Sequence, residues 1–165
     1  MKKYFVLALL CMWFGVLAEA QTTTPQNESE VSVANANGYG STGVYARTFA
    51  TTVASIGSDI SYTSDATNGD YFTINHTGVY AVTYSDGNPN GDNDGISLNF
   101  AATTTWSSAW GSGNELCNFT VANTGASCSV TVLLDSGDVL RAHRVSNSAG
   151  ANSQNLARFI IVRVR

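Results

Sequence analysis

Hydrophobic and polar residues alternate along most of the chain in short runs, which clusters of Gly, Asn, Asp and Ser separate. Alternation with a period of two is typical of a β-strand with one buried face, and no stretch shows a convincing helical spacing. Eight segments are expected to be strands on this basis. They are residues 44–50, 60–63, 70–74, 79–85, 96–100, 128–134, 139–145 and 156–165.

The strand spacing predicts the architecture. About eight to ten short strands need two sheets that bury each other's apolar faces, so we expect an all-β, antiparallel sandwich. The middle of the last strand is apolar on both faces, and only one face can serve the core. The second face needs cover from a partner subunit or from the remaining chain, and we assign Tyr80, Tyr84, Phe159 and Ile161 to an oligomer interface.

The first twenty residues have the pattern of a secretory signal peptide. Lys2 and Lys3 precede an apolar run that is short for a membrane span, and the small-x-small end at residues 18–20 suits cleavage before Gln21. The alternative is an uncleaved N-terminal anchor. We expect residues 1–20 to be removed, 21–42 to form a polar tail or linker, and 43–165 to form one domain. The protein is then secreted, or periplasmic in a bacterium, without membrane insertion after cleavage.

Charge excludes one class of partner. Removal of residues 1–20 leaves six basic and eleven acidic side chains, a net charge of −5 with no lysine. A basic surface for nucleic acid is therefore absent. Five of the six arginines lie in the last 25 residues, where they either meet acidic surface of the fold or of another subunit, or are ordinary solvated charge.

Two cysteines, Cys117 and Cys128, remain after cleavage. In a compartment that permits disulfides they are expected to pair, and the alternative is two free buried thiols. A bridge over so short a loop stabilises a fold by about 2–3 kcal/mol.

The loop at residues 86–95 places oxygen-bearing side chains at alternate positions. Ca²⁺ takes six to eight oxygen ligands, so a calcium site is one interpretation, and a long turn-rich hairpin is the other. An EF-hand would need a Glu where Ser97 stands. No cofactor is required. The possible ligands are Asp86, Asn88, Asn90, Asp92 and Asp94.

Trp106 and Trp110 lie four residues apart in a Ser/Gly-rich stretch. Exposed, they could stack on a sugar or anchor a protein partner; alternatively, they pack against an end of the sandwich. His76 and His143 stand far apart, and no nucleophile-elbow pattern accompanies them, so we do not expect an enzyme. Acceptor triplets for N-glycosylation begin at Asn27, Asn75 and Asn118, although such triplets also arise by chance in an Asn/Thr-rich chain.

Four weak motifs together resemble the complement component 1q and tumour necrosis factor superfamily. The stretch from Gly69 to Tyr84 resembles its G-x-F-x-I/V-x-x-x-G-x-Y segment, with Phe72 displaced by one position. Residues 96–100 are similar to a following strand, and 129–145 to its L-x-L-x-x-G-D-x-V signature. The final RFIIVRV is similar to its closing strand, without the usual Gly.

The resemblance covers about residues 44–165. It implies a ten-stranded jelly roll that assembles into homotrimers and binds an extracellular protein or glycan; this chain has no collagen-like stalk. The alternative is a monomeric carbohydrate-binding module or adhesin tip that uses Trp106 and Trp110. A small secreted hydrolase is a third and less favoured class.

Overall fold

The computed structural model describes residues 28–41, 44–87, 93–103, 113–120, 125–144 and 157–165. Within these ranges all regular structure is β, and no helix is long and apolar enough to cross a membrane. The ten strands are β1 (Glu30–Tyr39), β2 (Arg47–Ile56), β3 (Ile60–Thr63), β4 (Tyr71–Ile74), β5 (Gly78–Asp86), β6 (Asn93–Leu98), β7 (Glu115–Thr120), β8 (Ala126–Leu134), β9 (Val139–Arg144) and β10 (Arg158–Arg163).

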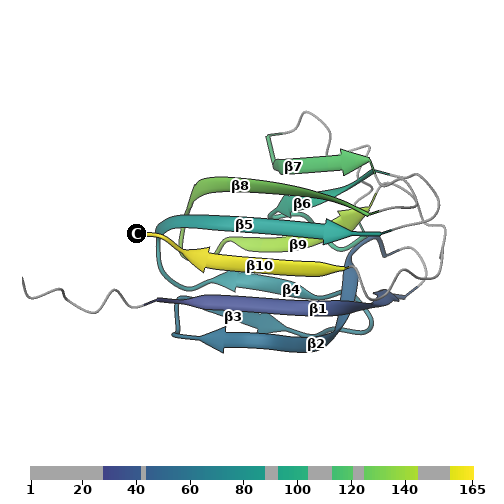
Figure 1. The fold of residues 1–165 in the computed structure, drawn as a ribbon, viewed down its shortest axis with the longest axis horizontal. Helices are drawn as coiled ribbons and strands as arrows, with labels where there is room; N and C mark the ends of the chain where they lie inside the picture. The colour runs from purple at the N-terminus through teal and green to yellow at the C-terminus, as the bar shows by residue number, and fades with distance from the viewer. Residues whose placement is uncertain (1–27, 42–43, 88–92, 104–112, 121–124, 145–156) are drawn as a thin grey trace, which may run out of the picture.

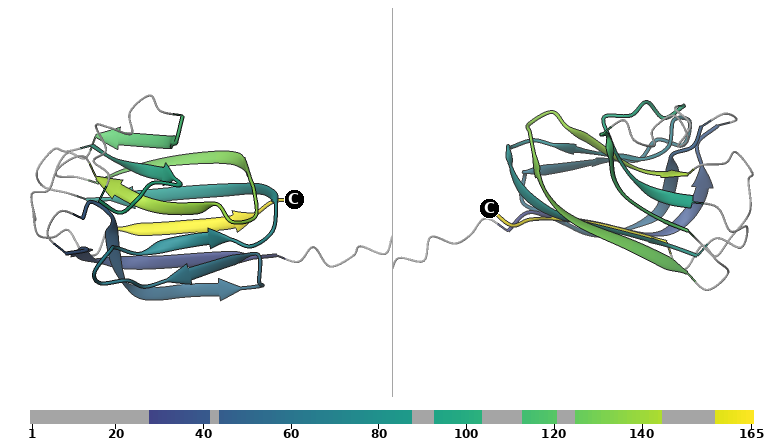
Figure 2. Two further views of the ribbon diagram at one scale, coloured as in Figure 1. Left: turned by 180° about the vertical axis from the view of Figure 1, so that it is seen from behind. Right: turned by 90° about the horizontal axis from the view of Figure 1, so that it is seen from above.

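The strands form two five-stranded sheets that face each other (Figures 1 and 2). The first sheet has the order β2-β1-β10-β5-β8, and the second has the order β3-β4-β9-β6-β7. Every strand pair is antiparallel. The predicted all-β, two-sheet jelly roll is confirmed, with ten strands at the upper end of the expected number.

Aromatic side chains fill the space between the sheets. Phe159 of β10 stacks on Phe72 of β4, with ring centroids 4.5 Å apart and planes within 8°. Tyr84 and Phe49 also contact Phe159, which therefore lies at the centre of the aromatic group. Large rings of this kind carry much of the hydrophobic stabilisation of a small core, because each buries 150–250 Å².

The N-terminal strand corrects the expected domain boundary. Residues 21–42 were expected to form a tail, but β1 lies within that range and Val31 and Val33 are fully buried. The strand occupies an interior position between β2 and β10. The domain therefore begins near residue 30 rather than residue 43.

Gly69 shows why a glycine stands at the start of the family-like segment. Its φ is +75°, a left-handed conformation that side chains disfavour. A Cβ atom there would also lie 2.5 Å from both the carbonyl oxygen and the Cβ of Ala46. Any other residue would have to push the entry into β4 away from the segment that precedes β2.

Candidate interaction site

The outer side of the first sheet is mostly uncharged, with Glu30 and Arg158 at its two ends. Strand register places alternate residues of β1, β10, β5 and β8 on this side, since their neighbours point into the core. We call this set the outer face. It consists of Glu30, Ser32, Ala34, Val79, Ala81, Thr83, Ser85, Ser127, Ser129, Thr131, Leu133, Arg158, Ile160 and Val162.

The outer face combines apolar and small polar side chains. Leu133 is 67% exposed, the largest value among the exposed large hydrophobic residues that the structure describes. Ile160 and Val162 are half-buried, and Thr83 is hydrogen-bonded to Ser129 across 2.8 Å. The middle of the face carries no charged side chain, so its removal from water costs little free energy and it is suited to contact with another protein surface.

The expected interface residues belong to the core instead. Tyr80, Tyr84, Phe159 and Ile161 are each at most 1% exposed, and they point toward the second sheet. The two faces of the last strand were predicted correctly, but the face assigned to an interface lies in the core. Ile160 and Val162, not Phe159 and Ile161, lie where a partner can reach.

A buried group of charges lies at the end of the sandwich where β5 finishes and β2 begins. Arg47 donates a hydrogen bond of 2.6 Å to Asp86, and both side chains are nearly inaccessible. Tyr84 donates to the other oxygen of Asp86 at 2.7 Å. Burial, followed by the charge of Asp86, raises the pKa of Tyr84 well above its usual range, so the phenol stays protonated and remains a donor.

Asp94 and Arg144 extend this group. Neither is measurably exposed, and Arg144 Nε lies 3.8 Å from Asp94 Oδ1. Tyr39 lies beside both arginines, with the guanidinium carbons of Arg47 and Arg144 4.7 and 5.4 Å from its ring centroid. Burial and the neighbouring Asp86 raise the pKa of Asp94 to about 8. We call Tyr39, Arg47, Tyr84, Asp86, Asp94 and Arg144 the buried charge group.

The buried charge group includes two of the five expected calcium ligands. Asp86 already accepts hydrogen bonds from Arg47, Tyr84 and the backbone N–H of Gly87. Asn88, Asn90 and Asp92 lie outside the described residues. The described part of the chain contains no group of three or more His, Cys, Asp or Glu side chains that could hold a metal ion. The calcium site stays a prediction, and two of its carboxylates have arginine partners that the sequence did not reveal.

Trp106 and Trp110 also lie outside the described residues. Their expected role in binding a sugar or a protein stays a prediction. Phe100, at the near end of the same segment, packs edge-on against His143 at a centroid distance of 6.2 Å.

The two histidines lie in different surroundings. His143 is buried and its Nδ1 is 2.7 Å from the hydroxyl of Ser97, which is also buried. Because both groups are inside the protein, this serine–histidine pair cannot meet a substrate from solution. His76 has a side chain 60% exposed and contacts Asp59 at the opposite end of the sandwich from the buried charge group.

Asp59 lies just before β3 of the second sheet and contacts residues beside β1 and at the end of β10 in the first sheet. It accepts hydrogen bonds from Ser29 and from Arg163 at 2.8 and 2.9 Å. Burial opposes ionisation of this carboxyl, but the bonds from Arg163 and Ser29 outweigh it and hold the pKa of Asp59 below its ordinary value. The arrangement stabilises the fold and offers no free group for chemistry.

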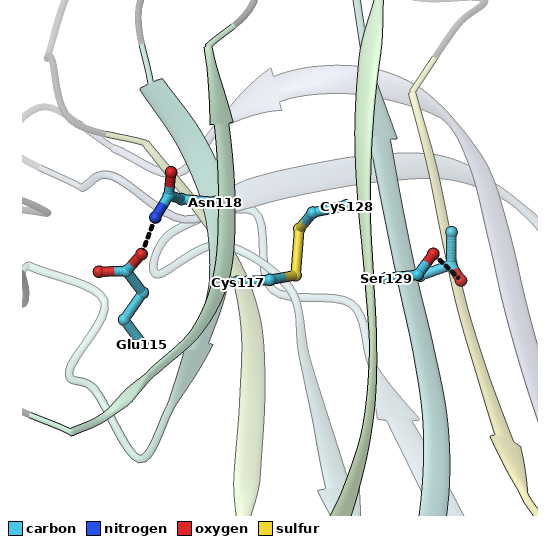
Figure 3. Close-up of a disulfide and its surroundings, with 6 residues drawn as sticks. Glu115, Cys117, Asn118, Cys128 and Ser129 are labelled. Carbon is cyan, nitrogen blue, oxygen red and sulfur yellow. Dashed lines mark hydrogen bonds between the residues drawn. A yellow bond between two sulfur atoms is a disulfide. The ribbon is translucent and has the colours of Figure 1, made fainter.

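A disulfide joins Cys117 of β7 to Cys128 of β8, as expected (Figure 3). The two strands are the neighbouring edges of the two sheets, so the bond connects one sheet to the other. A bond of this kind is typical of a protein that matures in an oxidising compartment.

The sequence matches no protein-family model and no curated protein. Solved structures, however, share the fold. Murine APRIL, in crystals at pH 5.0, aligns with a TM-score of 0.57 at 13% identity, over 83% of this chain and 99% of its own. Pika GITRL aligns with a TM-score of 0.52 at 12% identity, over 84% of this chain and 96% of its own. Rabbit GITRL aligns with a TM-score of 0.51 at 13% identity, over 83% of this chain and 94% of its own.

These neighbours are tumour necrosis factor superfamily ligands rather than enzymes. At such low identity the similarity establishes the fold alone. The chain has the jelly roll of the complement component 1q and tumour necrosis factor type, as its motifs indicated.

Proposed function

We propose that this protein is an exported recognition domain that assembles into homotrimers and binds an extracellular protein or glycan. The observation that carries the proposal is the outer face. The middle of this face is uncharged and runs across four strands, and the two charged residues of the set, Glu30 and Arg158, have opposite signs and lie at opposite ends. Two copies can therefore meet there without net charge repulsion. The fold of the solved ligands and the resemblance in the motifs favour a trimer as the product.

Export is supported by the N-terminal pattern and by the disulfide. Residues 1–20 have the order of a signal peptide, and Cys117 and Cys128 are bonded. Secretion from cells that make the full chain, with Gln21 as the new N-terminus, tests this part of the proposal. Full retention in the cell membrane would favour the uncleaved anchor.

Light scattering of the purified protein tests assembly. The expected molar mass is three times that of the processed chain at micromolar concentration. Leu133→Arg is expected to shift the mass toward the monomer, since the new charge must be desolvated in any contact on the outer face. Leu133 is exposed, so the substitution leaves the core unchanged.

The control variant is Ala101→Arg, which adds the same charge at an exposed position outside both sheets. It is expected to retain the mass of the wild type. A wild-type monomer, or equal masses for the two variants, would contradict assembly through the outer face.

A further inference from the structure

Three acceptor triplets for N-linked glycosylation occur in the chain, beginning at Asn27, Asn75 and Asn118. The triplet alone does not distinguish among them, since Asn, Ser and Thr are abundant throughout. The structure describes Asn75 and Asn118, and it places their side-chain amides in opposite situations. Asn27 lies outside the described residues.

The side-chain amide of Asn75 already makes two hydrogen bonds within the fold. Its Nδ2 donates to the carbonyl oxygen of Ser58 at 2.7 Å and to the hydroxyl of Ser61 at 2.8 Å. These two bonds use both amide hydrogens. A glycan replaces one of the hydrogens with a sugar ring, so one bond would be lost and the ring would have to displace the segment that connects β2 to β3. Asn75 is therefore a poor site.

The amide of Asn118 has room for a sugar. Asn118 is exposed and lies on β7, an edge strand of the second sheet. Its partner across the strand pair is Gly95, which has no side chain. Nδ2 donates to Glu115, and Figure 3 shows both side chains on the side of β7 away from Cys128. After one hydrogen is replaced, the second can still bond to Glu115.

The rest of the triplet fits the same face. Phe119 points inward and packs against Tyr84 with a centroid distance of 5.3 Å. Strand alternation then directs Asn118 and Thr120 outward together, and both are exposed. The Thr120 hydroxyl donates to Asn93 at 2.7 Å, at the surface. A glycan on Asn118 would thus disturb no core contact.

From this contrast we infer that Asn118 is an N-glycosylation site. The inference rests on the proposed export, because the modification occurs in the secretory pathway. The donor class is a lipid-linked oligosaccharide diphosphate. A bond forms between Asn118 Nδ2 and the anomeric carbon, the bond from that carbon to the phosphate oxygen breaks, and the lipid diphosphate leaves while the amide gives up a proton.

The location has a structural consequence. An edge strand offers unpaired backbone N–H and C=O groups to other chains, and natural proteins often cover such edges. A glycan on β7 would cover this edge of the second sheet. It would leave the outer face of the first sheet, on the other side of the sandwich, available for assembly.

Expression of the full chain in a secreting eukaryotic cell line tests the inference. The secreted protein is treated with peptide N-glycosidase, which converts a glycosylated Asn to Asp, and each acceptor peptide is read by mass spectrometry. We expect the conversion at Asn118 in most of the protein and not at Asn75. Asn118→Gln should lose the mass of that glycan, whereas the matched Asn75→Gln should retain it.

An unmodified Asn118 peptide in the secreted protein would overturn the inference, as would loss of the glycan in Asn75→Gln alone. A parallel version that carries the host's signal peptide in place of residues 1–20 separates the two proposals. If the native leader fails to export the chain but this version is glycosylated at Asn118, the proposed export is wrong and the site stands. The molar mass of the same samples reports on assembly independently.

Discussion

Arg47 and Asp86 form an ion pair of 2.6 Å inside the protein, with side-chain exposures of 4% and 0%. They stand 39 residues apart and connect the start of β2 to the end of β5. A buried pair is weak evidence for net stability, because desolvation of the two charges opposes their attraction. Removal of one partner alone is destabilising, since the other charge then stays buried without compensation.

Arg47→Met is therefore expected to destabilise the fold by about 3–5 kcal/mol, the usual cost of an uncompensated buried charge. Denaturant unfolding measures the change. The double variant Arg47→Met with Asp86→Asn removes both charges and keeps an acceptor for Tyr84, so it should recover much of the loss. A loss below about 1 kcal/mol in the single variant would place this pair among surface ion pairs and contradict its burial.

The raised pKa of Asp94 makes stability depend on pH. Between the ordinary carboxyl pKa and about 8, the folded protein holds a proton that the unfolded chain releases. Stability therefore falls as pH rises through this window, by up to about 1.4 kcal/mol per pH unit. Urea unfolding from pH 4.5 to pH 8.5 follows the effect.

Asp94→Asn is the matched control for the pH experiment. It has nearly the same shape without a titrating group, so the difference between wild type and variant isolates Asp94 from His76 and His143. The variant should show a flatter profile and gain relative stability at high pH. Parallel profiles of stability against pH for the two proteins would contradict a raised pKa of Asp94.

Phe159 belongs to the core, whereas the neighbouring Ile160 lies on the proposed interface. Phe159→Ala removes the ring stacked on Phe72 and is expected to cost about 3–5 kcal/mol, without a change in molar mass at conditions where the protein remains folded. Ile160→Arg, one residue on, should have the reverse effect: little loss of stability and a shift toward the monomer. The two are compared by thermal unfolding and light scattering. A mass shift in Phe159→Ala would contradict the role of this ring in the core alone.

Loss of the disulfide should weaken the fold by about 2–3 kcal/mol, since the bond closes a short loop between Cys117 and Cys128. The double variant Cys117→Ser with Cys128→Ser, compared with the oxidised wild type in denaturant, gives the value. Reduction of the wild type with a thiol should lower its stability by a similar amount. An unchanged midpoint after reduction would contradict a stabilising role.

Local patterns predicted much of the fold because alternation is a property of neighbouring residues. β3 was predicted with its observed bounds, and β5, β9 and β10 within a few residues. β1 and β7 were missed although apolar residues alternate with polar ones in part of each, because their Ser, Asn and Thr residues are also typical of loops and burial by distant strands decides their structure. The buried charge group was out of reach for the same reason: Arg47, Asp86 and Arg144 meet only after the two sheets have formed.

The wrong choice between the two faces of β10 has a different cause. Phe159 and Ile160 are both apolar, so alternation shows two faces without stating which points inward. The choice follows from register: Phe159 pairs with Tyr84 and Ile160 with Thr83, and only the first pair meets the aromatic rings of the second sheet. The pairing of β10 with β5, which local patterns do not show, decides which face of β10 is buried.

The disulfide at one side of the sandwich implies that the two sheets do not loosen evenly. β7 and β8 remain tethered even when their hydrogen bonds open, so separated strands rejoin quickly on that side. At the other side β2 has a single strand neighbour and an exposed second half. Amide hydrogen exchange should therefore be fastest in β2 and slowest toward the middle strands, and a protease that cuts the native protein within its strands should find β2 first.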